Sequence, residues 1–450
     1  MTFYLFPKRY KWVLLLTASY YFYMCWKWEY IFLILISTMV DFYAGIQIAK
    51  TPEKKKKKWF LLMSLFVNLG FLFYFKYFNF FTENTAALLS QFNVFTDLTY
   101  YDVLLPVGIS FYTFQTLSYT IDVYNGKTEP ETHLGYFALY VAYFPQLVAG
   151  PIERSSRLLP QLKREPNVTP EDIKYAVNKI LLGFFKKLVV ADTVSQYVDA
   201  IYANVDGTTG TQLYWAAFLF PVQLFADFSG YTDIAIGSAR LMGIRLMENF
   251  KKPLWQENHI SYWANWHISL TTWIRDYIFV PLTNYKKSTG ALALWTVLIL
   301  VLIGLWHGAN WTFIVFGIVN GCVILIQRVL RKTPVVRAIR SNRVSYQIMK
   351  YFNLNLLLLE AVYFRSVDVE MAHKIQWKIL TEFNFNINEL LALYKEEFIS
   401  AILVSALLWT TVLFKPDLKF KYNWIYVITI LFLIIFLGQD LDNQFIYFQF

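Results

Sequence analysis

The stretch LIGLWHGANW, Leu302–Trp311, places a histidine between small residues and tryptophans inside a long apolar run. The apolar residues around it are numerous enough to enter a membrane. An ionisable side chain at membrane depth is costly unless it is compensated, and such residues commonly mark functional sites. Imidazole also suits proton transfer near neutral pH. His307 is therefore either a catalytic group or a histidine packed between helices, and the residue alone favours neither interpretation.

The composition extends this apolar character to the whole chain. Of the 450 residues, 57% are hydrophobic, 20% aromatic and 16% charged, whereas soluble domains carry about 25% charged residues. The mean hydropathy is +0.39. Apolar runs follow one another along the chain without an internal repeat. We therefore predict an all-α polytopic membrane protein, with residues 1–450 forming a single integral-membrane domain.

The net charge of +10 comes from short basic clusters between apolar runs. Such clusters mark cytoplasmic loops under the positive-inside rule and are attracted to acidic lipid head groups. Some of them could instead line the mouth of a cavity, but none indicates nucleic-acid binding. The clusters are Lys8–Lys11, Lys50 with Lys54–Lys58, Lys186–Lys187, Lys251–Lys252, Lys286–Lys287 and Arg328–Lys350.

The two cysteines, Cys25 and Cys322, lie in apolar runs and indicate neither a disulfide framework nor a metal site. No small-residue cleavage site follows the first apolar run, so we expect the first span to act as its own insertion signal.

Because a span needs roughly 20 apolar residues, we expect about 11 membrane elements, several of them broken or re-entrant. Pro106 and Gly108 interrupt one run, and the Thr51–Lys58 segment ends another. Asp227–Asp233 has the composition of a turn at membrane depth. The candidate runs are Trp12–Trp26, Tyr30–Ile48, Trp59–Phe81, Leu104–Ile121, Leu134–Val148, Ile173–Ala200, Gln212–Phe225, Trp263–Leu282, Ala291–Trp306, Phe313–Ile326, Tyr351–Phe364, Phe398–Leu413 and Trp424–Leu437.

Two of the five histidines lie in apolar, tryptophan-rich surroundings, namely His267 and His307. His133 and His373 lie among polar residues and are expected to be solvated. His259 belongs to a polar loop and is a weak candidate. His267 and His307 belong to successive apolar runs and are able to converge, although their separation in sequence does not require it.

The chain lacks several known catalytic motifs, and this absence argues against some classes of enzyme but does not identify the reaction. The chain has no Gly-x-Ser-x-Gly elbow, no phosphate-binding glycine loop and no His-Glu-x-x-His motif. Asp227 and Asp233 lack further metal ligands, which favours helix capping or a proton path. Broken helices with buried polar groups also suit a transporter, but the chain shows no symmetry between its halves. These residues leave the choice between a membrane enzyme and a transporter open.

Several motifs occur together in an order that resembles the membrane-bound O-acyltransferases, in the bacterial branch of alginate, peptidoglycan and exopolysaccharide O-acetyltransferases. The resemblance spans nearly the whole chain. It rests on Leu105–Gln115, Phe144–Leu147 with Ala149–Ile152, Asp227–Gly237, Glu248–Phe250, Trp266–Leu270, Trp273–Tyr277, Gly304–Trp311 and Phe445–Phe450.

The resemblance implies a fold and a set of site residues. The fold is a ring of transmembrane and re-entrant helices around a central tunnel, where a cytoplasmic donor meets an acceptor from the other side. His307 matches the near-invariant catalytic histidine, and His267 matches a second position that is histidine in this branch. Trp266, Trp306 and Asn310 are the expected pocket walls, with Arg275 as a donor contact.

The chain departs from the family in two places. Members usually have a longer apolar segment before the motif that stands here as Pro7–Arg9. Relatives often carry two arginines before the tryptophan of the second motif, where this chain has Ala264 and Asn265. Any donor phosphates would then fall to Arg275, Lys251 or Lys252. No resident cofactor is implied.

The implied activity moves an acetyl group from cytoplasmic acetyl-CoA to an extracytoplasmic polysaccharide. It takes place in the cell inner membrane and uses a periplasmic acetyltransferase-like partner. The alternatives are D-alanyl transfer from a carrier protein and transport without chemistry.

Overall fold

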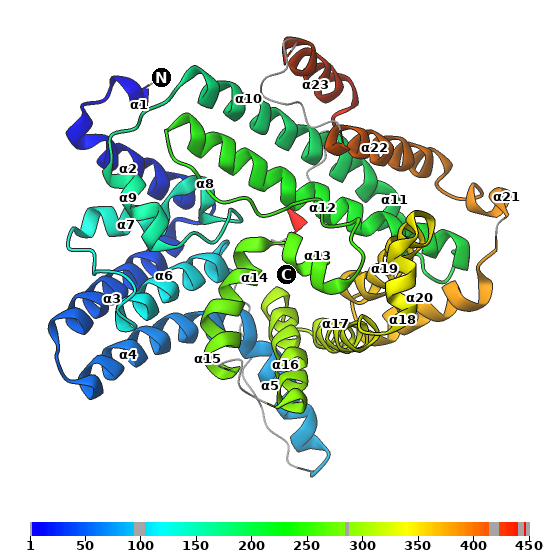
Figure 1. The fold of residues 1–450 in the computed structure, drawn as a ribbon, viewed down its shortest axis with the longest axis horizontal. Helices are drawn as coiled ribbons and strands as arrows, with labels where there is room; N and C mark the ends of the chain where they lie inside the picture. Colours follow the sequence, from blue (N-terminus) through cyan, green and yellow to red (C-terminus); the bar gives the residue numbers. More distant parts are fainter. Residues whose placement is uncertain are drawn as a thin grey trace. The chain divides into compact units, whose positions relative to one another are not determined.

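Every regular element in the described part of the chain is a helix, as the all-α prediction requires (Figure 1). The computed structural model describes residues 2–93, 104–283, 288–384, 386–413, 423–439 and 445–446. Lys286, Lys287 and residues 447–450, which the sequence analysis singled out, lie outside these ranges. Two compact units are present, residues 1–173 with 238–247 and residues 174–237 with 248–450. A single membrane domain over the whole chain stays a prediction.

The first unit is a set of packed helices whose most buried member is α6. Gly108, with a φ of 76°, begins α6 after Pro106, and a side chain there would lie 2.7 Å from the carbonyl oxygen of Leu147. The predicted interruption of this run is therefore confirmed. The helices are α1 Thr2–Leu5, α2 Lys11–Met24, α3 Ile31–Lys50, α4 Lys54–Leu72, α5 Phe78–Ser90, α6 Ile109–Tyr124, α7 Leu134–Ala142, α8 Phe144–Leu147 and α9 Ser155–Lys163.

The Thr51–Lys58 segment was predicted to end the run before it, and this prediction is confirmed, because α3 ends at Lys50. Lys54–Lys58 forms the first turns of α4. The chain breaks just before it, at Thr51 and Glu53, whose backbones are extended. Lysine is a good helix former, so the break falls at the residues around Pro52.

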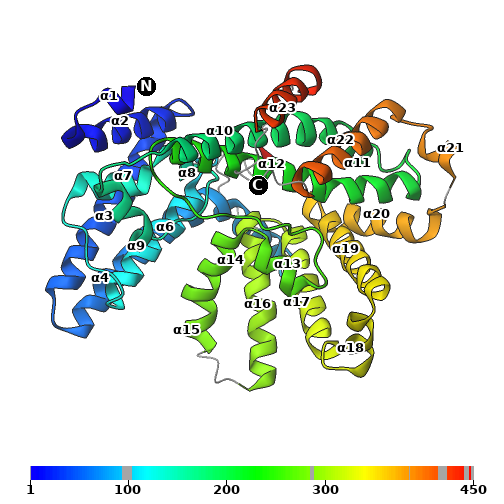
Figure 2. The same ribbon diagram turned by 45° about the horizontal axis from the view of Figure 1, so that its top comes forward.

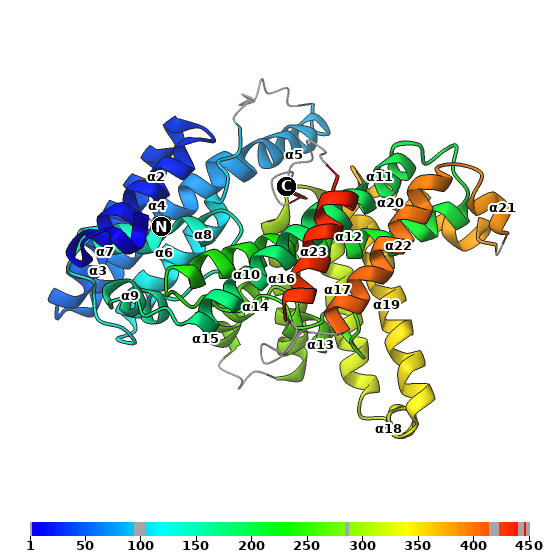
Figure 3. The same cartoon turned by 90° about the horizontal axis from the view of Figure 1, so that it is seen from above.

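The remaining helices belong wholly or mainly to the second unit. Figure 3 shows α22 beside α11, where the rings of Tyr197 and Phe398 lie 5.2 Å apart. A π-helical turn, Phe185–Ala191, joins α10 to α11. The helices are α10 Pro170–Phe184, α11 Asp192–Ala203, α12 Gly210–Leu241, α13 His259–Asn265, α14 Ile268–Ile274, α15 Val280–Thr283, α16 Thr289–His307, α17 Trp311–Leu330, α18 Pro334–Ser341, α19 Arg343–Arg365, α20 Val369–Glu382, α21 Ile387–Leu390, α22 Lys395–Leu413 and α23 Asn423–Leu437.

Four helices in the described ranges are long and apolar enough to cross a membrane. They are Trp28–Lys50, Lys54–Ser90, Gly290–His307 and Trp311–Leu330, and Trp424–Leu437 is a shorter apolar helix. The predicted run Trp263–Leu282 is not one continuous span, because it breaks at Trp266 and His267, between α13 and α14. From Ile268 the helix continues through a π-helical turn, Arg275–Phe279, into α15. The expected count of about 11 membrane elements stays a prediction.

The predicted turn at Asp227–Asp233 is also wrong, because α12 runs through it without a break. The Ser-Gly pair that suggested a turn serves helix packing instead. A side chain at Gly230 would lie 2.9 Å from the carbonyl oxygen of Gly183, in α10. Glycine at this position lets the backbones of α10 and α12 approach closely. Small residues of this kind are found both in turns and at close helix contacts, so the sequence alone did not distinguish the two.

Buried ion pairs join α10, α12 and the π-helical turn. Lys186 was counted among the basic clusters expected in cytoplasmic loops or at the mouth of a cavity, although it falls within the candidate run Ile173–Ala200. It is buried, with Nζ 2.7 Å from Oδ2 of Asp233. Lys179 lies 2.7 Å from the other oxygen of the same carboxylate. Although burial raises the pKa of Asp233, the two ammonium groups hold it below its usual value. Lys187 pairs in the same way with Asp192 and Asp227.

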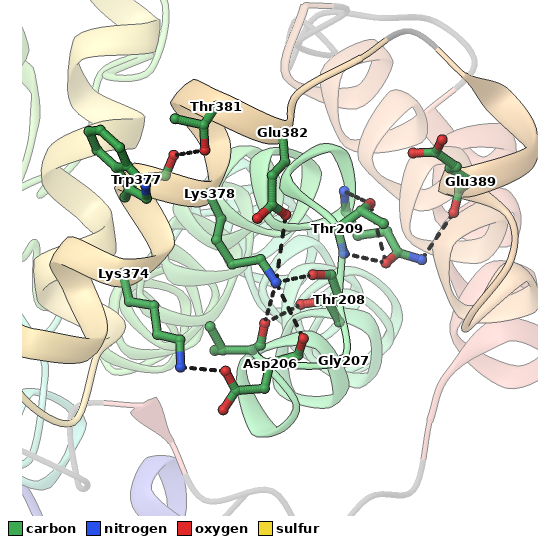
Figure 4. Close-up of polar contacts among 12 residues, drawn as sticks. Asp206, Gly207, Thr208, Thr209, Lys374, Trp377, Lys378, Thr381, Glu382 and Glu389 are labelled. Carbon is green, nitrogen blue, oxygen red and sulfur yellow. Dashed lines mark hydrogen bonds and ion pairs between the residues drawn. The ribbon is translucent and has the colours of Figure 1, made fainter.

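Lys378, one of the two lysines of α20, closes the loop that follows α11 (Figure 4). Lys378 Nζ donates to the carbonyl oxygens of Val205, Asp206 and Thr208, at 3.1, 3.3 and 2.5 Å. One ammonium group thereby satisfies three carbonyls beyond the end of α11.

The two helices that carry the His307 stretch form a tight hairpin, and Figure 2 shows α16 and α17 side by side. A side chain at Gly304 would lie 2.1 Å from the carbonyl oxygen of Phe313, and one at Gly317 would lie 2.5 Å from that of Leu300. Close backbone contact of this kind is typical of helix pairs in membranes. It fixes the end of α16 against the start of α17.

Candidate active site

His307 is the last residue of α16 and is 3% exposed. Aromatic rings surround its imidazole. The ring centroids of Trp306 and Phe364 each lie 4.9 Å away, and Phe313 lies at 6.5 Å with its ring nearly parallel. Gly308 follows, and a side chain there would lie 2.2 Å from the Phe313 ring. The small residue is thus required by the packing around the histidine.

His267 lies between α13 and α14 in a strained backbone conformation. Its φ and ψ are 42° and 54°, in the left-handed region that non-glycine residues seldom adopt. Asn249 holds the next two residues. The N–H of Ile268 donates to its carbonyl oxygen at 2.9 Å, and the N–H of Ser269 donates to its Oδ1 at 3.2 Å. Strain of this kind persists only where the surroundings impose it, and it is frequent at functional sites.

Trp306 brings the two predicted histidines together. Its ring centroid lies 5.6 Å from that of His267 and 4.9 Å from that of His307. His267 is fully buried, and the edge of its ring meets Phe228 at 4.7 Å. Burial lowers the pKa of His267 to about 3. The second histidine is therefore a neutral imidazole at physiological pH.

A small cavity of about 30 Å³ adjoins His307. Trp266 forms part of its wall and stacks on Tyr262, with ring centroids 5.5 Å apart and planes 18° apart. The wall is mainly apolar. The described residues with polar atoms that line it are Tyr262, Trp263, Trp266, His307, Asn320 and Glu360.

Arg275 lines a different and larger cavity, of about 390 Å³, between α14, α16 and α17. Its Nε lies 2.8 Å from Oδ1 of Asp276, and 56% of its side chain is exposed. Trp263 borders this cavity as well as the small one. Lys251 and Lys252, the other residues considered for donor phosphates, are exposed.

Asn310 caps α17, and its amide makes two structural contacts. Its Oδ1 accepts from the N–H of Thr312 at 3.0 Å, and its Nδ2 donates to the carbonyl oxygen of Val367 at 2.9 Å. Asn310 is not among the lining residues of either cavity. Its predicted place in a pocket wall remains a prediction.

The sequence analysis missed a buried pair beside the site. His259 was expected in a polar loop, but it opens α13 and is fully buried. Its Nε2 lies 2.8 Å from Oε2 of Glu360, which is 2% exposed. A signal for the pair was present, because Glu360 is a lone carboxylate in an apolar run, the same pattern that singled out His307.

Comparisons with known proteins bear on the whole chain. Residues 130–362 match the model of the membrane-bound O-acyltransferase family. A protein of Azotobacter vinelandii named "probable alginate O-acetylase AlgI" is 36% identical, over 83% of this chain and 73% of its own.

Two more distant relatives carry other names. The peptidoglycan O-acetyltransferase of Helicobacter pylori is 29% identical, over 82% of this chain and 73% of its own. The teichoic acid D-alanyltransferase of Bacillus subtilis is also 29% identical, over 48% of this chain and 58% of its own. The match to this enzyme family decides for a membrane enzyme over the transporter alternative, a choice that the helical membrane fold leaves open. The chain belongs to the membrane-bound O-acyltransferase family and is an O-acyltransferase.

Proposed function

We propose that this protein transfers an acetyl group from acetyl-CoA on the cytoplasmic side of the inner membrane to a hydroxyl group of a cell-envelope polysaccharide. The proposal rests on one observation: in a buried aromatic site, the ring of Trp306 packs against the rings of both His267 and His307. The names of the relatives, which act on alginate, peptidoglycan and teichoic acid, support a polymer acceptor.

In the proposed reaction His307 is the general base. The acceptor hydroxyl oxygen attacks the thioester carbonyl carbon while the imidazole takes its proton, and the C–S bond then breaks. The CoA thiolate leaves and receives the proton from the imidazolium, so atoms and charges balance. A positioned general base contributes about 10²–10⁴-fold to the rate. Trp306 and Phe364 enclose the imidazole, and low local polarity strengthens any dipole directed at the developing oxyanion.

His267 has a different role in the proposal. Because burial lowers its pKa to about 3, it does not compete for the proton that His307 accepts. As a neutral imidazole it offers one N–H donor, which suits orientation of the reacting groups or stabilisation of the oxyanion. Trp266 forms the wall of the cavity beside His307. Arg275 is the proposed contact for the donor, through the larger cavity that Trp263 also borders.

Acetyl transfer to a polymer on the far side of a membrane requires delivery of the acyl group there. We place a periplasmic acetyltransferase-like partner at that step. A second candidate is D-alanyl transfer from a carrier protein, which the match to the teichoic acid D-alanyltransferase favours. That match covers 48% of this chain, whereas the O-acetylase match covers 83%, so we place acetyl transfer first.

The test uses purified protein in nanodiscs with acetyl-CoA labelled in the acetyl group. Release of CoA and transfer of label to a glycan acceptor, with the candidate partner supplied, are followed together. Acetyl transfer is expected, with no turnover of a D-alanyl carrier. Turnover of the D-alanyl carrier alone would replace the first candidate with the second, and donor binding without CoA release or label transfer would contradict both.

A further inference from the structure

The buried pair of His259 and Glu360 adjoins the small cavity, whose wall includes Glu360. His259 Nε2 lies 3.0 and 2.8 Å from the two carboxylate oxygens of Glu360. On the other side of the ring, Nδ1 lies 2.8 Å from Oδ1 of Asn353. His259 is fully buried and Glu360 is 2% exposed. The ring is therefore held at both nitrogen atoms by residues of α19.

The surrounding amides determine the protonation of this pair. Gln327 accepts from the backbone N–H of His259 through Oε1, at 2.8 Å, so its Nε2 is the donor that reaches Asn353 Oδ1, at 2.9 Å. Asn353 Nδ2 donates to the carbonyl oxygen of Gln256 at 3.1 Å. Oδ1 of Asn353 is thus an acceptor, and its 2.8 Å contact favours a proton on His259 Nδ1 over acceptance from Gln327 Nε2, which lies farther away, at 3.3 Å.

The same reasoning applies to the other nitrogen. Nε2 points between two carboxylate oxygens, which suits an N–H directed at an ionised carboxylate better than a carboxylic acid with one O–H. This contact geometry fits an imidazolium paired with a carboxylate. The pair has no net charge, which lowers the cost of burying it. Its negatively charged member, Glu360, is the one that lines the cavity.

Glu360 faces the cavity that His307 also lines. Phe364 lies one helical turn beyond Glu360 on α19 and meets the His307 ring at 4.9 Å. The cavity volume of about 30 Å³ leaves room for little more than a water molecule or two, since each needs on the order of 10–15 Å³ of such space. The carboxylate and the catalytic imidazole therefore border the same small, mainly apolar space.

We propose that Glu360, held by His259, is a positioning residue that stabilises the imidazolium form of His307 during acyl transfer. The inference rests on the proposed function, in which His307 takes a proton from the acceptor. A carboxylate near an imidazole favours its protonated form, and low polarity between them strengthens the effect. The titratable groups that face His307 or Glu360 from the elements packed around them are Tyr262 and His259 in α13, His267 before α14, and Glu360 in α19.

The decisive test measures the pKa of His307 directly. The chain has five histidines, so NMR spectra of histidine-labelled protein in nanodiscs can be assigned by single substitutions. In Glu360→Gln the pKa of His307 is expected to fall by about one unit, the low end of the effect of a nearby opposite charge. The matched control is Glu257→Gln. Glu257 is two residues from His259, pairs with Arg340 and is not among the residues lining the cavity.

A second variant protects the test against misfolding. Glu360→Gln leaves His259 without its carboxylate, so the double variant His259→Gln with Glu360→Gln replaces both charges with neutral amides. The pKa of His307 is expected to fall in this variant too. If His307 titrates as in the wild type in either folded variant, the inference is wrong.

Activity separates failure of this inference from failure of the proposed function. With His307 as base, the rate of acetyl transfer rises with pH through its pKa, and Glu360→Gln is expected to move this rise about one unit lower and to reduce kcat more than it changes KM. If His307→Ala is inactive but the profile of Glu360→Gln matches the wild type, only the role of Glu360 is contradicted. If His307→Ala keeps full activity, the proposed base is contradicted, and the NMR result for Glu360 still stands by itself.

Discussion

The ring of Trp306 lies 5.6 Å from that of His267, with the planes 54° apart, and the next residue along α16 is His307. One indole therefore connects a neutral histidine in a strained turn with a histidine at the end of an apolar helix. Removal of the indole is expected to let both imidazoles shift. Small misplacements of catalytic groups cost up to about 10²-fold in rate.

We therefore expect Trp306→Ala to lower kcat by about 10²-fold, with a smaller effect in Trp306→Phe, which keeps an aromatic ring between the histidines. Single-turnover measurement of CoA release checks this. Equal rates for wild type and Trp306→Ala would show that the indole does not position the histidines.

The lowered pKa of His267 predicts a dependence of stability on pH. Burial lowers the pKa from 6.5 to about 3, so between these values the unfolded state binds the proton and the folded state does not. The stabilising effect of the neutral imidazole is complete above pH 6.5 and is lost as the pH falls below it.

His267→Asn is the informative variant, because asparagine also tolerates left-handed backbone angles. Between pH 6.5 and pH 5 the wild type is expected to lose stability relative to this variant by roughly 1.4 kcal/mol per pH unit. Denaturant titrations at several pH values measure the difference. A constant difference across this range would contradict the lowered pKa.

Asp233 is expected to be essential for stability. Its carboxylate is buried and holds both Lys179 and Lys186 at 2.7 Å. Asp233→Asn leaves ammonium groups buried without their charge partner, which costs about 3–5 kcal/mol. Glu248→Gln is the control, because Glu248 pairs with one ammonium group, that of Lys179, accepts a hydrogen bond from Tyr175, and has 39% of its side chain exposed. Equal melting temperatures for the two variants in detergent would contradict the account of this network.

Lys378 is expected to stabilise the loop after α11. Lys378→Met removes three hydrogen bonds from a charged donor to carbonyl oxygens, and we expect a loss of about 2 kcal/mol. Lys374, one turn earlier on α20, pairs with Asp206 at an exposed position, so Lys374→Met is expected to cost under about 1 kcal/mol. Thermal unfolding of both variants checks the comparison, and a larger loss in Lys374→Met would contradict it.

The sequence was informative wherever one physical requirement dominates a segment. The long apolar run Ala291–Trp306 was expected to form a membrane helix, and α16, Thr289–His307, contains it. The cost of polar groups in apolar surroundings singled out His267 and His307 as candidates, but it left open whether they converge. The family resemblance made both histidines specific candidates.

The errors arose at residue types that occur in two different structural settings. Gly230 suggested a turn, but it allows α12 to approach Gly183. Lys186 suggested a loop, but Asp233, 47 residues away, compensates its charge. His259 and Glu360 are 101 residues apart, and only the folded chain brings them together. Pairings between distant polar residues are set by tertiary packing, which a single sequence does not specify.

The most direct test of the central claim compares CoA release by wild type, His307→Ala and His373→Ala under single-turnover conditions with acetyl-CoA and a glycan acceptor. His373 is exposed, so its removal controls for the loss of any histidine. His307→Ala is expected to lose at least about 10²-fold in rate while His373→Ala matches the wild type. If His307→Ala releases CoA as fast as the wild type does, His307 is not the base of acyl transfer.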